Sequence, residues 1–355
     1  SKQSYNLLCI DEAQKIKNNL TATHQSIRNI TRKTSILLTG TPIENNVKDI
    51  WSIMDIIMPG YLGNKKGFMK KFDDQDNDIL LKKLVSPFLL RRTKTIINDL
   101  EKKTIKDVGI ALTNEQQTAY NLAVSNYLEK IEPNNSILKQ SSIRKNGMIL
   151  GLFTRLKQIC NFVQVNESYL SGKIQKYLDL IRNFSKSGEK TLVFTQYVST
   201  IDVLKRITES DSVYKNSVAC IHGGMSLKKR NNAVQSFQTN SEVKVLLISL
   251  KAGGVGLNLT AAKNVIVFDL WWNPASESQA IDRAHRIGQK QNVCVYRFIS
   301  TGTFEEKINK MLIEKMNLSE RILSDHTQQS SGHRSIFQYL TAMGNKDLET
   351  FLDIS

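Results

Sequence analysis

Two adjacent carboxylates follow the first short apolar run of the chain, and they are the residues there best suited to chemistry. Asp11 and Glu12 come directly after the run Leu7–Ile10. In parallel sheets ligands gather at the carboxyl ends of strands, so one carboxylate could hold Mg²⁺ while the other polarises a water. A solvated turn at the end of a strand explains the pair equally well.

A turn made of hydroxyls, glycine and proline follows the next apolar run, Ile36–Leu38. Its residues are Thr39, Gly40, Thr41 and Pro42. This turn could sense a phosphate or contact the first motif, and a plain turn is the alternative. A helix is predicted at residues 21–30, between the two runs, and the order strand–helix–strand favours a parallel α/β sheet.

Five apolar runs in the second half of the chain predict the strands of a second α/β domain, because stretches of helical length separate most of them. The runs are Thr191–Phe194, Val218–Ile221, Val243–Ile248, Val265–Phe268 and Val293–Phe298. Thr195, Gln196 and His222 follow these strands and are candidates for contact with a phosphate. A loop cap is the alternative. Trp272 follows another tryptophan, and neighbours on an extended chain face opposite ways, so one of the two should be exposed enough to stack.

A glycine-rich segment that includes Gly256 follows one of these strands, and its glycines let the backbone approach a phosphate closely. The segment matches neither the GxGxxG motif nor the phosphate-loop motif. Ser171-Gly172-Lys173 resembles the end of a phosphate loop, but Ile174 stands where Ser or Thr is required. The chain contains no GxxxxGK followed by Ser or Thr.

Gln279, Arg283 and Arg286 are spaced i, i+4 and i+7, which predicts that they share one face of a helix. Ser276 and Gln279 could cap the start of this helix, and Gly288 fits its end. Two arginines on one face could reach into a phosphate site as arginine fingers. A solvated basic face is the alternative.

The charge of the chain favours an anionic partner. Its 355 residues include 49 Lys and Arg against 33 Asp and Glu, a formal net charge of +16, which most often accompanies binding of nucleic acid. A basic enzyme without a polyanionic partner is the alternative. The four cysteines form no CxxC pair, so we expect neither a disulfide framework nor a zinc site. No apolar run reaches the roughly 18 residues that span a bilayer, which excludes a membrane protein.

These patterns predict an α/β protein with two parallel-sheet lobes, the first truncated and the second complete. Residues 1–60 would form the C-terminal part of lobe one, 61–171 a basic and helical bridge without clear strands, 172–316 lobe two, and 317–355 a polar tail with one short helix. Within the bridge, Thr113 followed by Gln116 three residues later predicts the start of a helix.

The motifs and their order resemble the SWI/SNF-type ATPases of helicase superfamily two. The resemblance rests on the segments Asp11–Asn18, Leu38–Asn46, Phe88–Lys94, Lys251–Leu259, Trp272–Pro274 and Gln279–Gln289. It covers roughly residues 5–315, and the run His-Arg-Ile-Gly-Gln beside Trp-Asn-Pro is specific to that family. The resemblance implies two RecA-like lobes that clamp ATP between them and step along double-stranded DNA as a monomeric motor.

The resemblance also implies roles for individual residues in the ATP site. Asp11 would bind Mg²⁺, and Glu12 would activate the attacking water. Arg283 and Arg286 would complete the site from lobe two. The remaining implied positions are Gln279 beside the arginines, Gly256 along the nucleotide, Thr39 to Pro42 coupling the site to DNA, Ser249 and Lys251 near the DNA backbone, and Arg91 and Arg92 on the bridge after lobe one.

The chain departs from the family pattern at its start, because the phosphate loop of the family lies upstream of the Asp-Glu motif and only ten residues precede Asp11 here. We expect a fragment of a DNA translocase that does not hydrolyse ATP by itself. A non-catalytic DNA-binding module and an RNA-directed helicase are the alternatives. The resemblance implies location at the nucleoid of a prokaryotic cytoplasm or in a eukaryotic nucleus, with DNA-bound proteins as candidate further partners and no membrane.

The charge predicts binding to DNA that is independent of base sequence and strongly dependent on salt. If Lys and Arg contact about six phosphates, the affinity should fall by roughly 10³-fold between about 50 and 200 mM salt. Fluorescence anisotropy with a labelled duplex at several salt concentrations measures this slope. An affinity that stays constant over the range would show that the positive charge serves another purpose.

Overall fold

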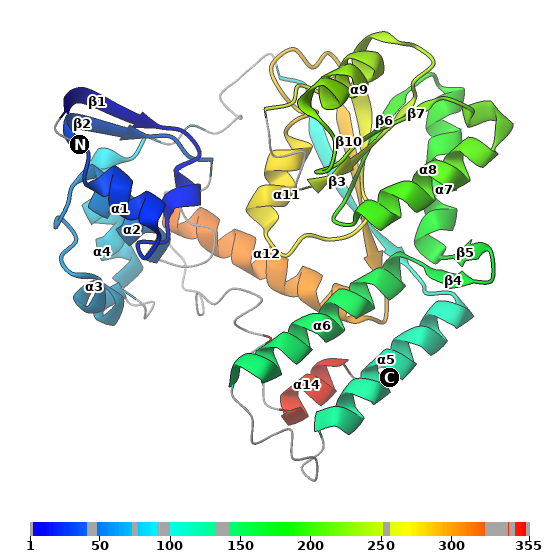
Figure 1. Cartoon of the computed structure of the whole chain (residues 1–355), viewed down its shortest axis with the longest axis horizontal. Helices are drawn as coiled ribbons and strands as arrows, with labels where there is room; N and C mark the ends of the chain where they lie inside the picture. The colour runs from blue at the N-terminus through cyan, green and yellow to red at the C-terminus, as the bar shows by residue number, and fades with distance from the viewer. Residues whose placement is uncertain are drawn as a thin grey trace. The chain divides into compact units, whose positions relative to one another are not determined.

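The computed structural model describes residues 3–40, 48–72, 77–90, 92, 100–131, 142–250, 256–323, 340 and 345–352. The chain divides into two compact units, one of residues 1–92 and 311–339 and the other of residues 93–310 and 340–355. Figure 1 shows the elements of both units along the chain. None of the described helices is long and apolar enough to cross a membrane.

The first unit contains a two-stranded parallel sheet of β1 (Ser4–Ile10) and β2 (Thr31–Leu37), with Ile10 opposite Leu37. The helix α1 (Ala22–Arg28) joins the strands, and the Thr21 hydroxyl caps it by accepting a hydrogen bond of 3.3 Å from the backbone of His24. The predicted order strand–helix–strand is therefore confirmed. Both faces of the sheet are largely open, and Leu7 is 52% exposed.

The other helices of the first unit form its apolar core. They are α2 (Lys48–Ile57), α3 (Lys65–Phe72) and α4 (Asp78–Val85), with the short 3-10 helices η1 (Ala13–Ile16) and η3 (Ser86–Phe88). Trp51, Phe68 and Leu81 are buried in this cluster. An ion pair of 2.8 Å between Arg28 and Asp55 connects α1 to α2.

A six-stranded sheet, parallel throughout, forms the centre of the second unit, in the order β3-β10-β9-β6-β8-β7. Its strands are β3 (Lys103–Ile110), β6 (Lys190–Thr195), β7 (Val218–Ile221), β8 (Val245–Ser249), β9 (Ala262–Val267) and β10 (Val293–Ser300). The five strands predicted from the apolar runs are all present.

The sixth strand, β3, corrects the expectation that the middle of the chain lacks strands. It pairs along its whole length with β10, from Lys103 opposite Val293 to Ile110 opposite Ser300. The strand escaped prediction because it lies at the edge of the sheet and contains the polar pairs Lys103-Thr104 and Lys106-Asp107, so it lacks the continuous apolar run of a central parallel strand. A short hairpin of β4 (Val163–Val165) and β5 (Ser168–Leu170) also lies in this region.

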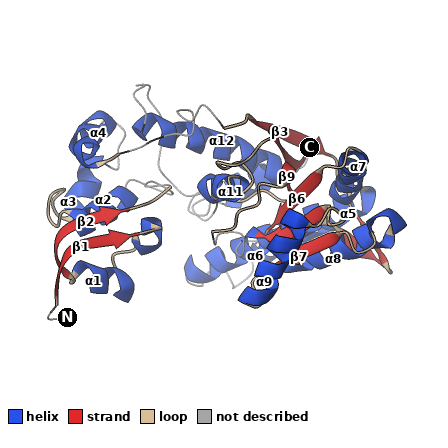
Figure 2. Ribbon diagram, turned by 90° about the horizontal axis from the view of Figure 1, so that it is seen from above, coloured by secondary structure: helices blue, strands red, loops and turns tan. Residues whose placement is uncertain are grey.

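Helices cover both faces of the six-stranded sheet (Figure 2). On one face, α9 (Leu227–Thr239) and α11 (Pro274–Ile281) pack on a cluster that includes Phe194 and Val265. On the other face, α7 (Gly172–Lys186) and α8 (Val198–Ser210) pack on a cluster that includes Val193 and Ile266. Consecutive strand residues thus serve opposite cores, as expected from the alternation of side chains along a strand.

The helices α5 (Asn114–Ile131) and α6 (Ser142–Asn161) pack against each other beside the sheet. The predicted capping box at the start of α5 is confirmed, since Thr113 and Gln116 exchange side-chain-to-backbone hydrogen bonds of 3.2 and 3.3 Å. The remaining elements are the 3-10 helix η6 (Ser212–Tyr214) and the helices α12 (Phe304–Leu323) and α14 (Asn345–Leu352).

The segment Ser171-Gly172-Lys173 has a structural role, in agreement with its rejection as a phosphate loop. The Ser171 hydroxyl caps α7, and the Lys173 ammonium forms a buried ion pair of 2.8 Å with Glu305. A Cβ added to Gly172 would lie 2.4 Å from the Ala111 carbonyl oxygen, so this close approach requires glycine.

Because β3 completes the sheet, a protein of residues 93–355 should unfold cooperatively, whereas a protein of residues 172–355 should be markedly less stable. Removal of the buried Ile110 side chain alone typically costs about 2–5 kcal/mol. Urea denaturation followed by circular dichroism compares the two free energies of unfolding. Equal stability of the two proteins would contradict the importance of β3.

Candidate nucleotide and nucleic-acid interface

The carboxylate motif of the first unit lies where β1 ends, and its backbone turns sharply there. Glu12 has φ 54° and ψ 47°, in the left-handed region that side chains other than glycine seldom adopt. The Asp11 carboxylate stabilises this turn by accepting a hydrogen bond of 2.8 Å from the Glu12 backbone. Asp11 is exposed and Glu12 is partly exposed, so both carboxylates are open to a ligand.

Gln14 connects the two predicted motifs of the first unit. Its side-chain amide donates a hydrogen bond to the Glu12 carboxylate, and its oxygen accepts one of 2.8 Å from the Thr39 hydroxyl. Thr39 therefore reaches the Glu12 carboxylate through Gln14. Gln14 itself was not predicted as a site residue, although it belongs to the same short motif. Gly40 is exposed, while Thr41 and Pro42 lie outside the described residues.

Most described candidates for DNA contacts lie at the carboxyl edge of the sheet of the second unit. Thr195 and Ser249 end β6 and β8, and Gln196 and His222 directly follow β6 and β7. Because the sheet is parallel, these four residues share one edge, as the positions after predicted strands indicated. Lys251 and Arg91 lie outside the described residues, and Arg92 is exposed.

The carboxylate of Asp269, just after β9, organises this edge. It accepts hydrogen bonds from the Thr195 hydroxyl, from the Gln196 backbone at 2.9 Å and from the Asn161 amide at 3.0 Å. Thr195 is fully buried and Ser249 is 3% exposed, so their side chains face the interior, whereas Gln196 and His222 are partly exposed. Asp269 was missed from sequence because its partners lie far away along the chain.

The two adjacent tryptophans are both partly exposed and pack on different neighbours. Trp271 packs against the core cluster of the sheet. Trp272 contacts the Phe153 ring edge to face, at 6.1 Å between centroids, and the Lys157 ammonium lies 4.6 Å from its ring centroid. The same ammonium donates a hydrogen bond of 2.8 Å to the Leu270 carbonyl, so Lys157 fixes the loop after β9.

The helix predicted to present Gln279, Arg283 and Arg286 on one face ends earlier than expected. The helix α11 spans Pro274–Ile281, and Asn273, rather than Ser276, supplies the capping side chain. Arg283 bonds back three residues to the Ala280 carbonyl at 3.0 Å, which tightens the chain into turns. Both arginines therefore lie beyond the helix, and the shared helical face is wrong. Gly288, with φ 98°, closes this turn.

Long-range hydrogen bonds hold these turns at the amino edge of the sheet. The Gln289 amide donates to the carbonyls of Thr260 and Ala262, both at 3.0 Å, and Ala262 begins β9. The His285 ring bonds to the Glu101 carbonyl at 2.6 Å, two residues before β3. Sequence reasoning missed both anchors because their partners are distant in the chain.

The predicted arginines and glycine meet around the loop before β9. Arg286 donates a hydrogen bond of 3.3 Å to the Leu257 carbonyl, next to Gly256 in the chain. The Arg283 carbonyl accepts one of 3.0 Å from Leu259. Gly256 has φ 43°, which strains most other residues, and it is exposed. Gln279 lies two residues before the end of α11, which crosses from the carboxyl edge to the amino edge.

Comparisons with known proteins identify the class. Residues 1–165 match the model of the SNF2-related domain, and residues 172–288 match that of the helicase conserved C-terminal domain. The structure is similar to the SWI2/SNF2 ATPase core of Sulfolobus solfataricus in complex with dsDNA, with 36% identity, a TM-score of 0.59, and coverage of 98% of this chain and 73% of that one. The chain therefore belongs to the SWI2/SNF2-type ATPases.

Two curated relatives show how the chain compares with longer proteins. It is 36% identical to the putative ATP-dependent helicase/translocase YwqA of Bacillus subtilis, over 100% of this chain and 38% of that protein. It is 30% identical to the ISWI chromatin-remodeling complex ATPase ISW2 of Saccharomyces cerevisiae, over 91% of this chain and 30% of that protein. The chain thus spans about a third of the length of these relatives.

The burial of Lys157 predicts a pH dependence of stability. Lys157 is 3% exposed, and burial lowers its pKa from 10.5 to about 8, although the Asp269 carboxylate opposes this. Between pH 8 and 10.5 the unfolded chain holds a proton here that the folded chain has lost, so this residue makes the protein more stable as pH rises.

A Lys157→Met variant should lack this rise. The difference between the free energies of unfolding of the protein and the variant should change by about 1 kcal/mol per pH unit within the window. Urea denaturation at several pH values measures both curves, and the alkaline titrations that the two proteins share cancel. Parallel curves would show that Lys157 keeps its ordinary pKa in the fold.

Proposed function

We propose that this chain is part of an ATP-dependent motor that moves along double-stranded DNA. The observation that supports this proposal most is the likeness to a dsDNA-bound SWI2/SNF2 core over 98% of the chain at 36% identity. The relatives named as ATP-dependent helicases support the use of ATP. The net charge of +16 supports a polyanionic partner.

Asp11 and Glu12 suit the two tasks that nucleotide hydrolysis requires. Mg²⁺ is commonly bound through one or two carboxylates together with phosphate oxygens and waters, and the exposed Asp11 carboxylate at the end of β1 fits that role. No group of three or more His, Cys, Asp or Glu side chains that could hold a metal ion occurs in the described part of the chain. Phosphate oxygens and waters would be the other ligands of the ion. Bound MgATP supplies the phosphoanhydride bond that is broken.

Glu12 is the residue that we assign to the attacking water. Gln14 fixes its carboxylate, and Thr39 fixes Gln14, so Glu12 is held without losing its partial exposure to solvent. A movement of Thr39 would reach Glu12 through the two hydrogen bonds of Gln14. This relay is the route by which we propose that DNA contact is coupled to hydrolysis.

The second unit would divide its tasks between the two edges of its sheet. At the carboxyl edge, the partly exposed Gln196, His222 and Trp272 would contact DNA, beside Thr195 and Ser249. At the amino edge, Arg283, Arg286, Gln279 and Gly256 would act on the nucleotide. The helix α11 runs from one edge to the other and would make the two tasks depend on each other.

The arginine assignment makes a prediction for the longer protein that contains this chain. An arginine finger neutralises charge that develops in the transition state, so Arg286→Ala should lower DNA-stimulated ATP turnover by about 10³-fold. The affinities for ATP and for DNA should change much less. Arg286→Lys should restore little activity, because an ammonium lacks the planar fork of guanidinium. Steady-state turnover and duplex titration measure these quantities.

Lys290→Ala is the matched control, because Lys290 is exposed just after the same turn. It should keep turnover within about 2-fold of the parent, since surface substitutions seldom matter. Retained turnover with lost DNA binding in Arg286→Ala would instead make Arg286 a backbone clamp. Stimulation by RNA in place of duplex DNA would favour an RNA-directed helicase, and no turnover in the parent would favour a DNA-binding module.

A further inference from the structure

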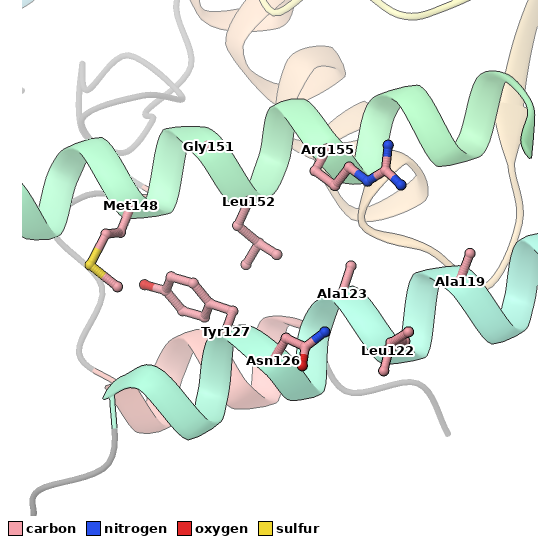
Figure 3. Close-up of a pocket in the computed structure, with 9 residues that line it drawn as sticks. All are labelled: Ala119, Leu122, Ala123, Asn126, Tyr127, Met148, Gly151, Leu152 and Arg155. Carbon is pink, nitrogen blue, oxygen red and sulfur yellow. The ribbon is translucent and has the colours of Figure 1, made fainter. Parts of the chain in front are cut away.

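An open groove of about 400 Å³ runs between α5 and α6, and none of the residues that line it is a candidate for contact with ATP or DNA (Figure 3). Its lining is mostly apolar: Ala119, Leu122, Ala123, Met148, Gly151 and Leu152. Leu122 is 60% exposed, whereas Leu152 is 7% exposed and forms part of the floor. On α5 the groove extends from Ala119 to Tyr127, which is about 12 Å of helix.

Two glycines one turn apart lie within α6, where glycine weakens a helix. A Cβ added to Gly147 or to Gly151 would meet no atom within 4 Å in the part of the chain that the structure describes. Packing within the described part of the chain therefore does not explain why glycine occurs at these two positions. At Gly151, which lines the groove, the absence of a side chain leaves the helix backbone open to close approach by another chain.

Tyr127 gives a second and independent sign of a ligand. The residue is only 6% exposed, its hydroxyl is buried with no hydrogen-bond partner among the described residues, and its side chain points into the space between α5 and α6 in Figure 3. A buried hydroxyl without a partner is costly, so such groups usually have one when the site is filled. Burial also raises the pKa of Tyr127 to about 12, which keeps the hydroxyl a donor.

Arg155 sets the charge of the groove. It is the charged residue among those that line it, it is exposed, and no hydrogen bond or ion pair to it occurs within the described residues. A carboxylate on the occupant would complement this guanidinium. A third helix fits an open groove between two helices. A helix forms its backbone hydrogen bonds internally, whereas an added strand would need the edge of a sheet to form them.

We propose that the groove between α5 and α6 binds an amphipathic helix of another protein, which places apolar side chains over Leu122 and Gly151 and an Asp or Glu beside Arg155. The residues that line the groove are not among those assigned to ATP and DNA, so this inference does not rest on the proposed function.

Synthetic peptides test the proposal on the whole chain. The probe is a fluorescent helical peptide of about 18 residues with Leu at i, i+3, i+4 and i+7 and one flanking Glu, and its match carries Lys in place of Glu. Anisotropy should give at least about 10-fold tighter binding for the Glu peptide. Arg155→Glu should reverse this preference.

Gly151→Leu and Gly147→Leu form a matched pair, since each removes a helix-interior glycine and neither meets a neighbour. Gly151→Leu fills the groove and should weaken binding by about 10-fold or more, whereas Gly147→Leu should change it less than about 2-fold. Thermal unfolding checks that both variants fold. Equal effects of the two substitutions, indifference to peptide charge, or no binding at about 1 mM would overturn the proposal. So would self-association of the chain that Gly151→Leu abolishes, because the occupant would then be a second copy.

Discussion

The hydrogen bonds to the Asp269 carboxylate hold together the part of the second unit on which its proposed chemistry depends. Asp269 follows β9 and binds the end of β6 through Thr195 and Gln196. It also binds Asn161 at the end of α6, whose carbonyl accepts a hydrogen bond of 2.6 Å from the Ser171 hydroxyl that caps α7. One buried carboxylate thus joins two strands and two helices. Without it, the fully buried Thr195 hydroxyl would lose its acceptor, and a buried polar group left unpaired costs more than the loss of the bond itself.

The sequence predicted the central strands well, because a parallel strand buried on both faces must be apolar at successive positions. It failed for β3, where lysines at the sheet edge broke that pattern, although Ile110 is buried. The capping box at Thr113 was predictable because both partners lie within one turn. Asn273 is followed by Pro274, and proline favours the first position of a helix. The helix therefore begins at Pro274 with Asn273 as its cap, and not after Ser276.

The same difference between local and distant partners decides which residues of the candidate site could be predicted. Asp11, Glu12 and the strand-end residues were found because their position after apolar runs is a local property. Gln14, Asp269 and Gln289 were not found, because each acts through atoms that are remote in sequence or through a side chain with several possible partners. The arginines were predicted as site residues, but their arrangement was predicted wrongly. Their spacing indicated a shared face of one helix, whereas the hydrogen bonds of Gln289 hold the chain in turns after Ile281.

The position of β10 between β3 and β9 affects how the chain can reach this fold. β10 is the last strand of the sheet to be synthesised, yet it pairs on one side with β3, which lies about 190 residues earlier in the chain, as in the pair of Val293 and Lys103. Until residues 293–300 leave the ribosome, the facing edges of β3 and β9 have no partner. Contacts of such long range fold slowly, and open strand edges invite pairing with other chains. The second unit therefore keeps two strand edges open to other chains until its last strand enters the gap between them.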